Sequence, residues 1–286
     1  MEYVILNNNV KMPKLGYGVY QVDKDICEKC VMDALAVGYR LIDTAQSYYN
    51  EEQVGNAIAK SGIPRDEIFL TTKVWLSNYG YEETEKSVYQ SLKKLRTDYL
   101  DLILLHQPFG DYYGAYRALE KLYKDGIARA IGVSNFYPDR LADICAFNEI
   151  TPQINQVETH PFNQQKAAQQ YMEQRNVQME CWAPFAEGRN GMFSQPILQQ
   201  IASKYNKSVA QIILRWLTQR NIVTLAKSVH KNRMQENLDI FDFNLTDEDM
   251  TKISKLDEGK SLFFDHRTPE AVDMMVNLMK LRKNMK

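Results

Sequence analysis

The sequence predicts an α/β protein, a (β/α)8 barrel of the TIM type. Strand-like and helix-like segments alternate from residue 14 to residue 225 and give eight strands, the number at which a parallel sheet closes into a barrel. The stretch "LDLILLH" at 100–106 is apolar nearly throughout. Helices that cover both faces of a parallel sheet produce this pattern.

The elements are expected in the following order. A hairpin comes first, at "YVILNNNVKMP", whose Asn-rich centre suits a turn. The strands are expected at 14–18, 39–43, 67–74, 100–105, 127–133, 153–157, 177–182 and 222–225. The helices between them are expected at 25–37, 51–60, 82–95, 114–124, 138–147, 164–174 and, with a break, 195–219.

Local signals support the helix at 51–60. Asn50 can cap its start, and Glu51 and Glu52 meet the positive end of the helix dipole. Gly62 follows its end, where glycine commonly stops a helix.

Cys27 and Cys30 form a C-x-x-C pair, but no second cysteine or histidine pair stands at zinc-site spacing. Cys30 also belongs to the apolar face of the helix at 25–37. We therefore expect packed thiols and no metal site.

The chain is expected to form one domain over 1–286, because no linker rich in Pro, Gly or Ser divides it. Residues 257–286 are expected to form a C-terminal tail that folds over the barrel mouth as a lid. There Phe263, Phe264 and His266 either touch the substrate or pack against the protein.

Composition excludes several classes of partner. Hydrophobic residues make up 44% and charged residues 25%, as in ordinary globular proteins. The net charge of -1 provides no broad positive field for a nucleic acid. No window approaches the roughly 20 apolar residues that span a bilayer, and no signal peptide is visible, so a cytoplasmic protein without a membrane partner is expected.

Polar or amphipathic residues stand just beyond seven successive predicted strands. Each has a structural explanation when taken alone, such as capping the next helix, and a lone histidine is more often structural than catalytic. In a barrel, however, strand ends meet at one mouth, where the active site lies. The residues are Asp43, Lys73, His106, Ser134 with Asn135, Gln156, Trp182 and Lys227.

Lys73 is the most informative of them, because a buried ammonium needs a partner and Asp43 on the neighbouring strand can supply it. Tyr48 or Tyr49 can reach the same mouth, and a nearby lysine favours phenolate and lowers the phenol pKa from its usual value of about 10. His106 can orient a carbonyl oxygen. Together these groups suit proton delivery to a carbonyl.

Carbonyl reduction also needs a hydride, which no side chain supplies, so a nicotinamide cofactor is implied. Trp182 offers a flat face for its ring, and Ser134, Asn135 and Gln156 offer hydrogen bonds for its amide. No G-x-G-x-x-G follows a strand. The basic segment "AKSVHKNRMQEN" at 226–237 instead suits phosphate, since barrels often bind phosphate after the eighth strand.

These motifs resemble the aldo-keto reductase family from "LGYGVY" to "FDFNLTDEDM", which is nearly the whole chain. The carrying motifs are "LIDTAQSYYNEEQVG", "TTKVW", "LILLHQP", "IGVSNF", "INQVETHPF", "WAPFAEG" and "AKSVHKNRMQENLDIFDFNL". In detail they are most similar to bacterial reductases of the 2,5-diketo-gluconate reductase and glyoxal reductase kind.

The resemblance implies that Tyr48, not Tyr49, is the general acid, that Lys73 and Asp43 tune it, and that His106 positions the carbonyl. It implies substrate contacts from Tyr20, Trp75 and His106, NADPH rather than NADH as cofactor, and a monomer. The implied cofactor contacts are Ser134, Asn135, Gln156, Trp182, Lys227, Ser228, Arg233, Glu236 and Asn237.

Three positions depart from the family pattern. Ala226 stands where proline usually precedes the lysine, so the phosphate loop is expected to be less rigid. "WAPF" replaces the common "WSPL" beside the cofactor. Tyr20 replaces the tryptophan of well-known mammalian members, so their substrate preferences do not transfer.

The leading hypothesis is an NADPH-dependent reductase of aldehydes, dicarbonyls of the glyoxal and methylglyoxal type, or keto sugars. One alternative is an aldolase in which Lys73 forms a Schiff base. The other is a non-catalytic protein that holds NADPH as a redox sensor.

Overall fold

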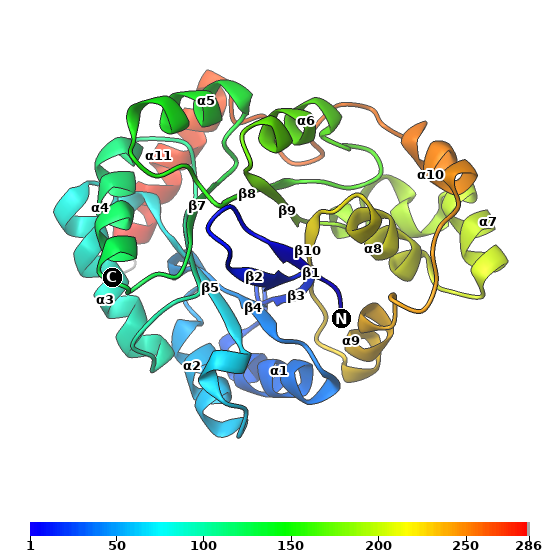
Figure 1. The fold of residues 1–286 in the computed structure, drawn as a ribbon, viewed down its shortest axis with the longest axis horizontal. Helices are drawn as coiled ribbons and strands as arrows, with labels where there is room; N and C mark the ends of the chain where they lie inside the picture. Colours follow the sequence, from blue (N-terminus) through cyan, green and yellow to red (C-terminus); the bar gives the residue numbers. More distant parts are fainter. Residues whose placement is uncertain (285–286) are drawn as a thin grey trace.

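A closed barrel of eight parallel strands forms the centre of the computed structural model, which describes residues 1–284. The strand order is β10-β3-β4-β5-β6-β7-β8-β9, so the first barrel strand pairs with the last. Helices surround the strands as an outer ring (Figure 1). The prediction of a (β/α)8 barrel is therefore confirmed.

The barrel strands begin one to four residues later than the sequence predicted. The first begins at residue 15 where 14 was predicted, and the fifth begins at residue 131 where 127 was predicted. Leu100 and Ala128, which lie ahead of β6 and β7, are buried but form only an isolated bridge. The strands are β3 (Leu15–Gly18), β4 (Leu41–Asp43), β5 (Phe69–Val74), β6 (Leu102–Leu105), β7 (Ile131–Ser134), β8 (Ile154–Glu158), β9 (Gln178–Trp182) and β10 (Val223–Ala226).

The predicted helices are present, and the break expected in 195–219 falls at Asn206 in the left-handed conformation, after which Ser208 caps the next helix. Two C-terminal helices, α10 (Asp247–Ser254) and α11 (Pro269–Asn284), were not predicted. The others are α1 (Lys24–Val37), α2 (Glu51–Lys60), α3 (Tyr81–Leu95), α4 (Tyr112–Lys124), α5 (Pro138–Phe147), α6 (Lys166–Gln174), α7 (Pro196–Tyr205), α8 (Val209–Gln219) and α9 (Lys231–Leu238). Short 3-10 turns occur at η1 (Gln46–Tyr48), η2 (Arg65–Glu67), η3 (Leu76–Asn78) and η4 (Ala186–Ser194).

Asn50 occupies the N-cap position of α2, as predicted, but its side chain does not cap the helix. The side chain of Asn50 makes no bond to the start of the helix. Its amide oxygen accepts from Thr44 Oγ1 at 2.9 Å, and its amide nitrogen donates to the Val19 carbonyl at 3.0 Å. Asn50 thus ties the loop after β4 to the loop after β3.

The N-terminal hairpin closes the bottom of the barrel. Strands β1 (Tyr3–Ile5) and β2 (Lys11–Pro13) pair in antiparallel fashion and lie across the barrel end that faces the viewer in Figure 1. Their inward side chains join the starts of the barrel strands in an apolar plug, which comprises Val4, Leu6, Met12, Leu41, Phe69, Leu102, Leu104, Ala130, Ile154, Val223 and Leu225.

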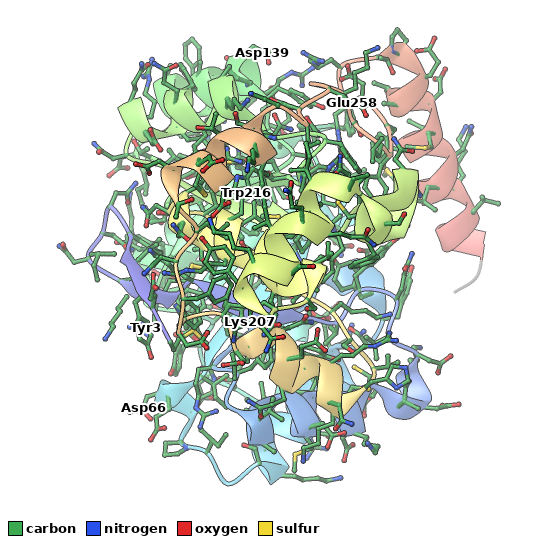
Figure 2. All side chains as sticks on the ribbon, turned by 90° about the vertical axis from the view of Figure 1, so that its right-hand side faces the viewer. Tyr3, Asp66, Asp139, Lys207, Trp216 and Glu258 are labelled. Atoms are coloured by element: carbon green, nitrogen blue, oxygen red, sulfur yellow. The ribbon has the colours of Figure 1, made fainter. Side chains whose placement is uncertain are left out.

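The described part of the tail, residues 257–284, lies at the other end. The red helix α11 is on the opposite side of the molecule from the strand that carries Tyr3 (Figure 2). Ala271 and Met275 of α11 pack with Trp75, Leu76 and Phe109 near the strand ends. Residues 285 and 286 lie outside the described part.

Cys27 and Cys30 are buried and unpaired on α1, as expected for packed thiols. Within residues 1–284, no group of three or more His, Cys, Asp or Glu side chains is arranged to hold a metal ion. None of the described helices is both long and apolar enough to cross a membrane.

Candidate active site

Lys73 and Asp43 form a buried ion pair at the C-terminal end of the barrel. Asp43 is the last residue of β4, and Lys73 lies near the end of the neighbouring β5. Lys73 Nζ donates to Asp43 Oδ1 at 2.5 Å and to the Thr44 carbonyl at 3.1 Å, and its side chain is 0% exposed. The partnership predicted from the sequence is present, because a buried ammonium is costly without it.

Tyr48 is the phenol that reaches this pair. It ends the short turn η1 directly after β4, and its hydroxyl lies 3.3 Å from Lys73 Nζ. Tyr49 takes the left-handed conformation and is 47% exposed. The local geometry therefore separates two tyrosines that the residues alone left equivalent, because only Tyr48 is shown within hydrogen-bond distance of Lys73.

The pKa of Tyr48 differs from the expectation of a lowered value. Burial raises it to about 12 and outweighs the Lys73 cation, which acts in the expected, lowering direction, while Asp43 raises it further. The expectation failed because it counted the charge and not the loss of water around the phenol. Tyr48 is consequently protonated at neutral pH, as a proton donor must be.

Lys73 itself stays charged. Burial lowers its pKa, but Asp43 and Tyr48 outweigh burial and bring the pKa to about 12. Burial raises the pKa of Asp43, and the Lys73 cation opposes this rise.

His106 follows β6 and is held from several sides. Its Nδ1 lies 3.3 Å from Ser47 Oγ. Its ring meets Tyr48 and Trp75 edge to face, with ring centroids 5.6 Å and 5.2 Å apart. These contacts fix the imidazole beside the phenol, so both can address one oxygen atom.

A cavity of about 710 Å³ opens over these groups, a size typical of small-molecule sites. Strand-end polar groups and side chains from the tail both line it. The strand-end part includes Asp43, Tyr48, His106, Ser134, Asn135, Gln156, Trp182 and Lys227, with Tyr20 and Trp75 nearby. The tail contributes Phe263, Phe264, His266, Met274, Met275 and Leu278.

The residues predicted to meet a nicotinamide amide lie together at the ends of β7, β8 and β9. Ser134 Oγ donates to the Gln156 carbonyl at 2.9 Å. Asn135 adopts φ 65°, donates to the His106 carbonyl at 3.2 Å and accepts from Trp182 Nε1 at 2.8 Å. These bonds orient the indole of Trp182, and Phe263 meets its ring edge to face.

The segment after β10 is divided between the cavity and the surface. Lys227 is exposed and lines the cavity. Ser228 is buried; its Oγ accepts from the His230 N–H at 3.1 Å, and its carbonyl accepts from Tyr17 Oη at 2.7 Å. Arg233, Glu236 and Asn237 lie farther along on α9 and do not line the cavity. Of the residues predicted to bind the adenosine end, only Lys227 lines the cavity.

Sequence reasoning missed three residues of this region. Ser47 touches His106. Glu180 is fully buried and accepts from Gln156 Nε2 at 3.0 Å. Glu158 binds the tail through Ser261 and Leu262. A charged residue within an otherwise strand-like run, as in "QMECW", is the signal that would have found Glu180.

Comparison with known proteins agrees with this geometry. The family model described as "Aldo/keto reductase family" matches residues 14–258. The chain belongs to the aldo/keto reductase family. Glyoxal reductase of Bacillus subtilis (strain 168) is 48% identical to it over 259 residues, which are 90% of this chain and 93% of the relative. Methylglyoxal reductase DkgA of Escherichia coli (strain K12) is 40% identical over 254 residues, 88% of this chain and 92% of the relative.

Solved structures share the fold closely. An aldo-keto reductase from a deep-sea metagenome library superimposes on this aldo-keto reductase with a TM-score of 0.90 at 41% identity, covering 93% of this chain and 98% of that one. A Bombyx mori aldo-keto reductase in complex with NADP gives a TM-score of 0.88 at 32% identity, covering 92% of this chain and 95% of that one.

Family membership makes this protein an NADP-dependent oxidoreductase, since aldo-keto reductases bind NADP(H). The donor set of the cavity fits that cofactor. Gln156 lines the cavity with both amide hydrogens already engaged, which leaves an acceptor for a carboxamide. Trp182 would face the ring, and Lys227, which lines the cavity, would supply a positive charge to a phosphate.

Proposed function

We propose that this aldo-keto reductase reduces aldehydes, dicarbonyls of the glyoxal and methylglyoxal type, or keto sugars to alcohols, with Tyr48 as general acid. The observation that carries the proposal is the Tyr48 hydroxyl at 3.3 Å from Lys73 Nζ, beside His106 and on the wall of the cavity. The 48% identity to a glyoxal reductase and the 40% identity to a methylglyoxal reductase support this substrate range.

The residues divide the work of proton delivery. When bound, NADPH supplies the hydride. Tyr48 gives its proton to the carbonyl oxygen as negative charge develops there, which leaves a phenolate. Lys73, held by Asp43, stabilises that phenolate because its charge lies 3.3 Å away. His106 orients the same oxygen, and solvent later returns the proton to Tyr48.

In this proposal Ser134, Asn135 and Gln156 would hold the nicotinamide amide, and Trp182 would face the ring. The adenosine end is bound by Lys227, Ser228, Arg233, Glu236 and Asn237. The charges of Lys227 and Arg233 favour NADPH over NADH, because only NADPH carries a 2′-phosphate.

Tyr20, Trp75 and His106 form the substrate-binding wall in this proposal. The Tyr20 and Tyr48 ring centroids lie 5.0 Å apart, which supports a shared pocket. The chain acts as one domain, and its tail from 257 onward serves as a lid that adds apolar surface to the pocket. Monomeric state and cytoplasmic location stay predictions.

Replacing Tyr48 by Phe tests the proposal. We expect kcat for methylglyoxal reduction to fall about 10²–10⁴-fold, the range for loss of a general acid, while the NADPH Kd stays within about twofold. Tyr49→Phe is the matched control, with unchanged kcat. Undiminished turnover in Tyr48→Phe would reject the assignment. Rates of NADPH oxidation with glyoxal, methylglyoxal, aromatic aldehydes and keto sugars then define the substrate range.

The two alternatives make different predictions. An aldolase would use neutral Lys73, but Asp43 holds the lysine charged, with a pKa of about 12. Borohydride trapping of a substrate on Lys73 would support that reading. A redox sensor would quench NADPH fluorescence on binding yet reduce none of a broad aldehyde panel; the complete set of Asp43, Tyr48, Lys73 and His106 argues against it.

A further inference from the structure

Glu180 is a buried acid that the mechanism above does not use. It lies in the middle of β9 and pairs in register with Gln156 on β8. Its side chain is 0% exposed, and its Oε1 has no hydrogen-bond partner among the described residues. A buried carboxyl is costly, so its retention inside the barrel calls for a physical reason.

The contacts of Gln156 supply that reason. Its Nε2 donates to Glu180 Oε2 at 3.0 Å and to Asp43 Oδ2 at 3.2 Å. The amide nitrogen has only two hydrogens, so both are occupied within the barrel. The opposite orientation would point the amide oxygen at the Asp43 carboxylate, which has no hydrogen to donate, and at the Glu180 carboxyl, which has at most one.

We propose that Glu180 is a positioning residue: together with Asp43 it orients the Gln156 amide so that Gln156 Oε1 faces the cavity as an acceptor for the nicotinamide carboxamide. This inference rests on the proposed cofactor site. Glu180 does not line the cavity, so it would influence cofactor binding from inside the barrel, through Gln156.

The charge balance determines the state in which Glu180 acts. One cation, Lys73, faces two buried carboxyl groups, and it contacts Asp43 at 2.5 Å. Burial raises the pKa of Glu180 to about 8, and the Asp43 charge adds to the rise, while Gln156 and Lys73 oppose it. Cys181, the other titratable neighbour, has its pKa raised by burial, so it stays a thiol at neutral pH. Glu180 is therefore neutral at pH 7 and gains a charge near pH 8.

Cofactor binding measured by fluorescence titration tests the positioning role. Glu180→Leu removes the acceptor, and we expect the NADPH Kd to rise roughly tenfold, the effect of one misplaced hydrogen-bonding group. Gln156→Leu should raise it by a similar factor. The double variant should match Gln156→Leu alone and not multiply the two effects, because Glu180 acts through Gln156.

Glu180→Gln provides a second readout that does not depend on the leucine variant folding. It keeps a neutral acceptor, so its NADPH Kd should stay within about twofold of the wild type. In the wild type, ionised Glu180 favours the cationic ring of NADP+, so the ratio of the NADPH Kd to the NADP+ Kd should rise between pH 7 and 9. The phosphates are common to both cofactor forms, so their titration changes both Kd values equally and leaves the ratio unchanged. Glu180→Gln should abolish the pH dependence of the ratio.

Each outcome separates the two proposals. Wild-type protein that binds no NADPH would overturn the cofactor site itself. Wild-type binding together with an unchanged Kd in Glu180→Leu, multiplied effects in the double variant, or wild-type pH dependence in Glu180→Gln would overturn the role of Glu180 alone.

Discussion

The two ends of the barrel are built from opposite kinds of side chain. The bottom is an apolar plug under the hairpin, in which Met12 is 0% exposed. The mouth buries Asp43, Lys73 and Glu180, which are all at most 3% exposed. One end gains stability from burying apolar surface, whereas the other removes ionisable groups from water, among them the charged pair of Asp43 and Lys73.

This difference indicates that stability and chemistry are assigned to separate ends. Active sites of such barrels lie at the C-terminal ends of the strands, and the opposite end is free to serve folding. Changes at the bottom should therefore alter unfolding with little effect on turnover. Changes at the mouth should alter turnover, with effects on unfolding that depend on whether a charge is left unpaired.

The largest effect is expected from Lys73→Met, which leaves Asp43 buried without its cation. We expect kcat to fall about 10²–10⁴-fold, because nothing then stabilises the Tyr48 phenolate. The free energy of unfolding should fall by about 3–5 kcal/mol, measured by chemical denaturation.

The double variant Asp43→Asn/Lys73→Met separates the two losses. Neutralising both partners should recover most of the stability, since no unpaired charge is left, while kcat stays low. Recovery of activity along with stability would contradict the division between the two ends.

Met12→Ala probes the bottom and is expected to act on stability alone. Deleting this buried side chain should lower the free energy of unfolding by about 2–5 kcal/mol and leave kcat within about twofold. Met274→Ala is the matched change at the mouth. Met274 is 41% exposed and lines the cavity, so stability should change by no more than about 0.5 kcal/mol while substrate KM shifts. A large loss of kcat in Met12→Ala would break the comparison.

The sequence revealed the framework of the mouth because its signals are local. Alternating strands and helices fix which strand ends share the mouth, so Asp43, Lys73 and His106 could be placed together from their positions alone. Tyr48 was separable from Tyr49 only by resemblance, because the turn η1 that orients them depends on backbone conformation at Ala45 and Tyr49.

Several features that depend on burial or on distant contacts were not predicted. The raised pKa of Tyr48 follows from lost solvent, which no spacing reveals. Glu180 pairs with a residue 24 positions away. The tail helix α11 is weakly patterned, with Val272, Val276 and Leu281 exposed, so its periodicity gave no clear signal.

Exposed charges of the mouth should have a smaller, selective effect. Arg233→Ala removes a charge expected to bind the 2′-phosphate, so the NADPH Kd should rise about ten- to hundredfold, while the weaker NADH Kd stays unchanged. Lys231→Ala is the control on the same helix, because Lys231 lies 3.7 Å from Asp33 and is not assigned to the cofactor. Equal losses for NADPH and NADH would show that Arg233 does not read the phosphate.

The smallest effect concerns how the tail is held on the mouth. Glu158 Oε1 accepts from the Leu262 N–H at 2.9 Å and from His160 Nε2 at 2.9 Å, and Glu158 Oε2 accepts from Ser261 Oγ at 2.5 Å. Burial raises the pKa of Glu158, but these bonds outweigh it and hold the pKa below its ordinary 4.5. The stabilisation is thus present above about pH 4.5 and is lost as pH falls through the lowered value.

His266 adds a second pH window to the tail. Burial lowers its pKa from 6.5 to about 4, against the opposing charges of Glu158 and Asp265. Between pH 6.5 and 4, His266 therefore binds a proton more readily in the undocked tail than in the docked tail. Docking of the tail weakens as pH falls through that range. Phe109 stacks on His266, which makes His266→Phe a conservative way to remove this window.

Limited proteolysis of residues 257–284 between pH 7 and 3.5 separates the two windows. As pH falls, the tail of the wild type should become cleavable in two stages. His266→Phe should lack the stage above pH 4.5. Glu158→Gln should lack the stage below pH 4.5. Tail cleavage that is independent of pH in the wild type would mean that neither group holds the lid.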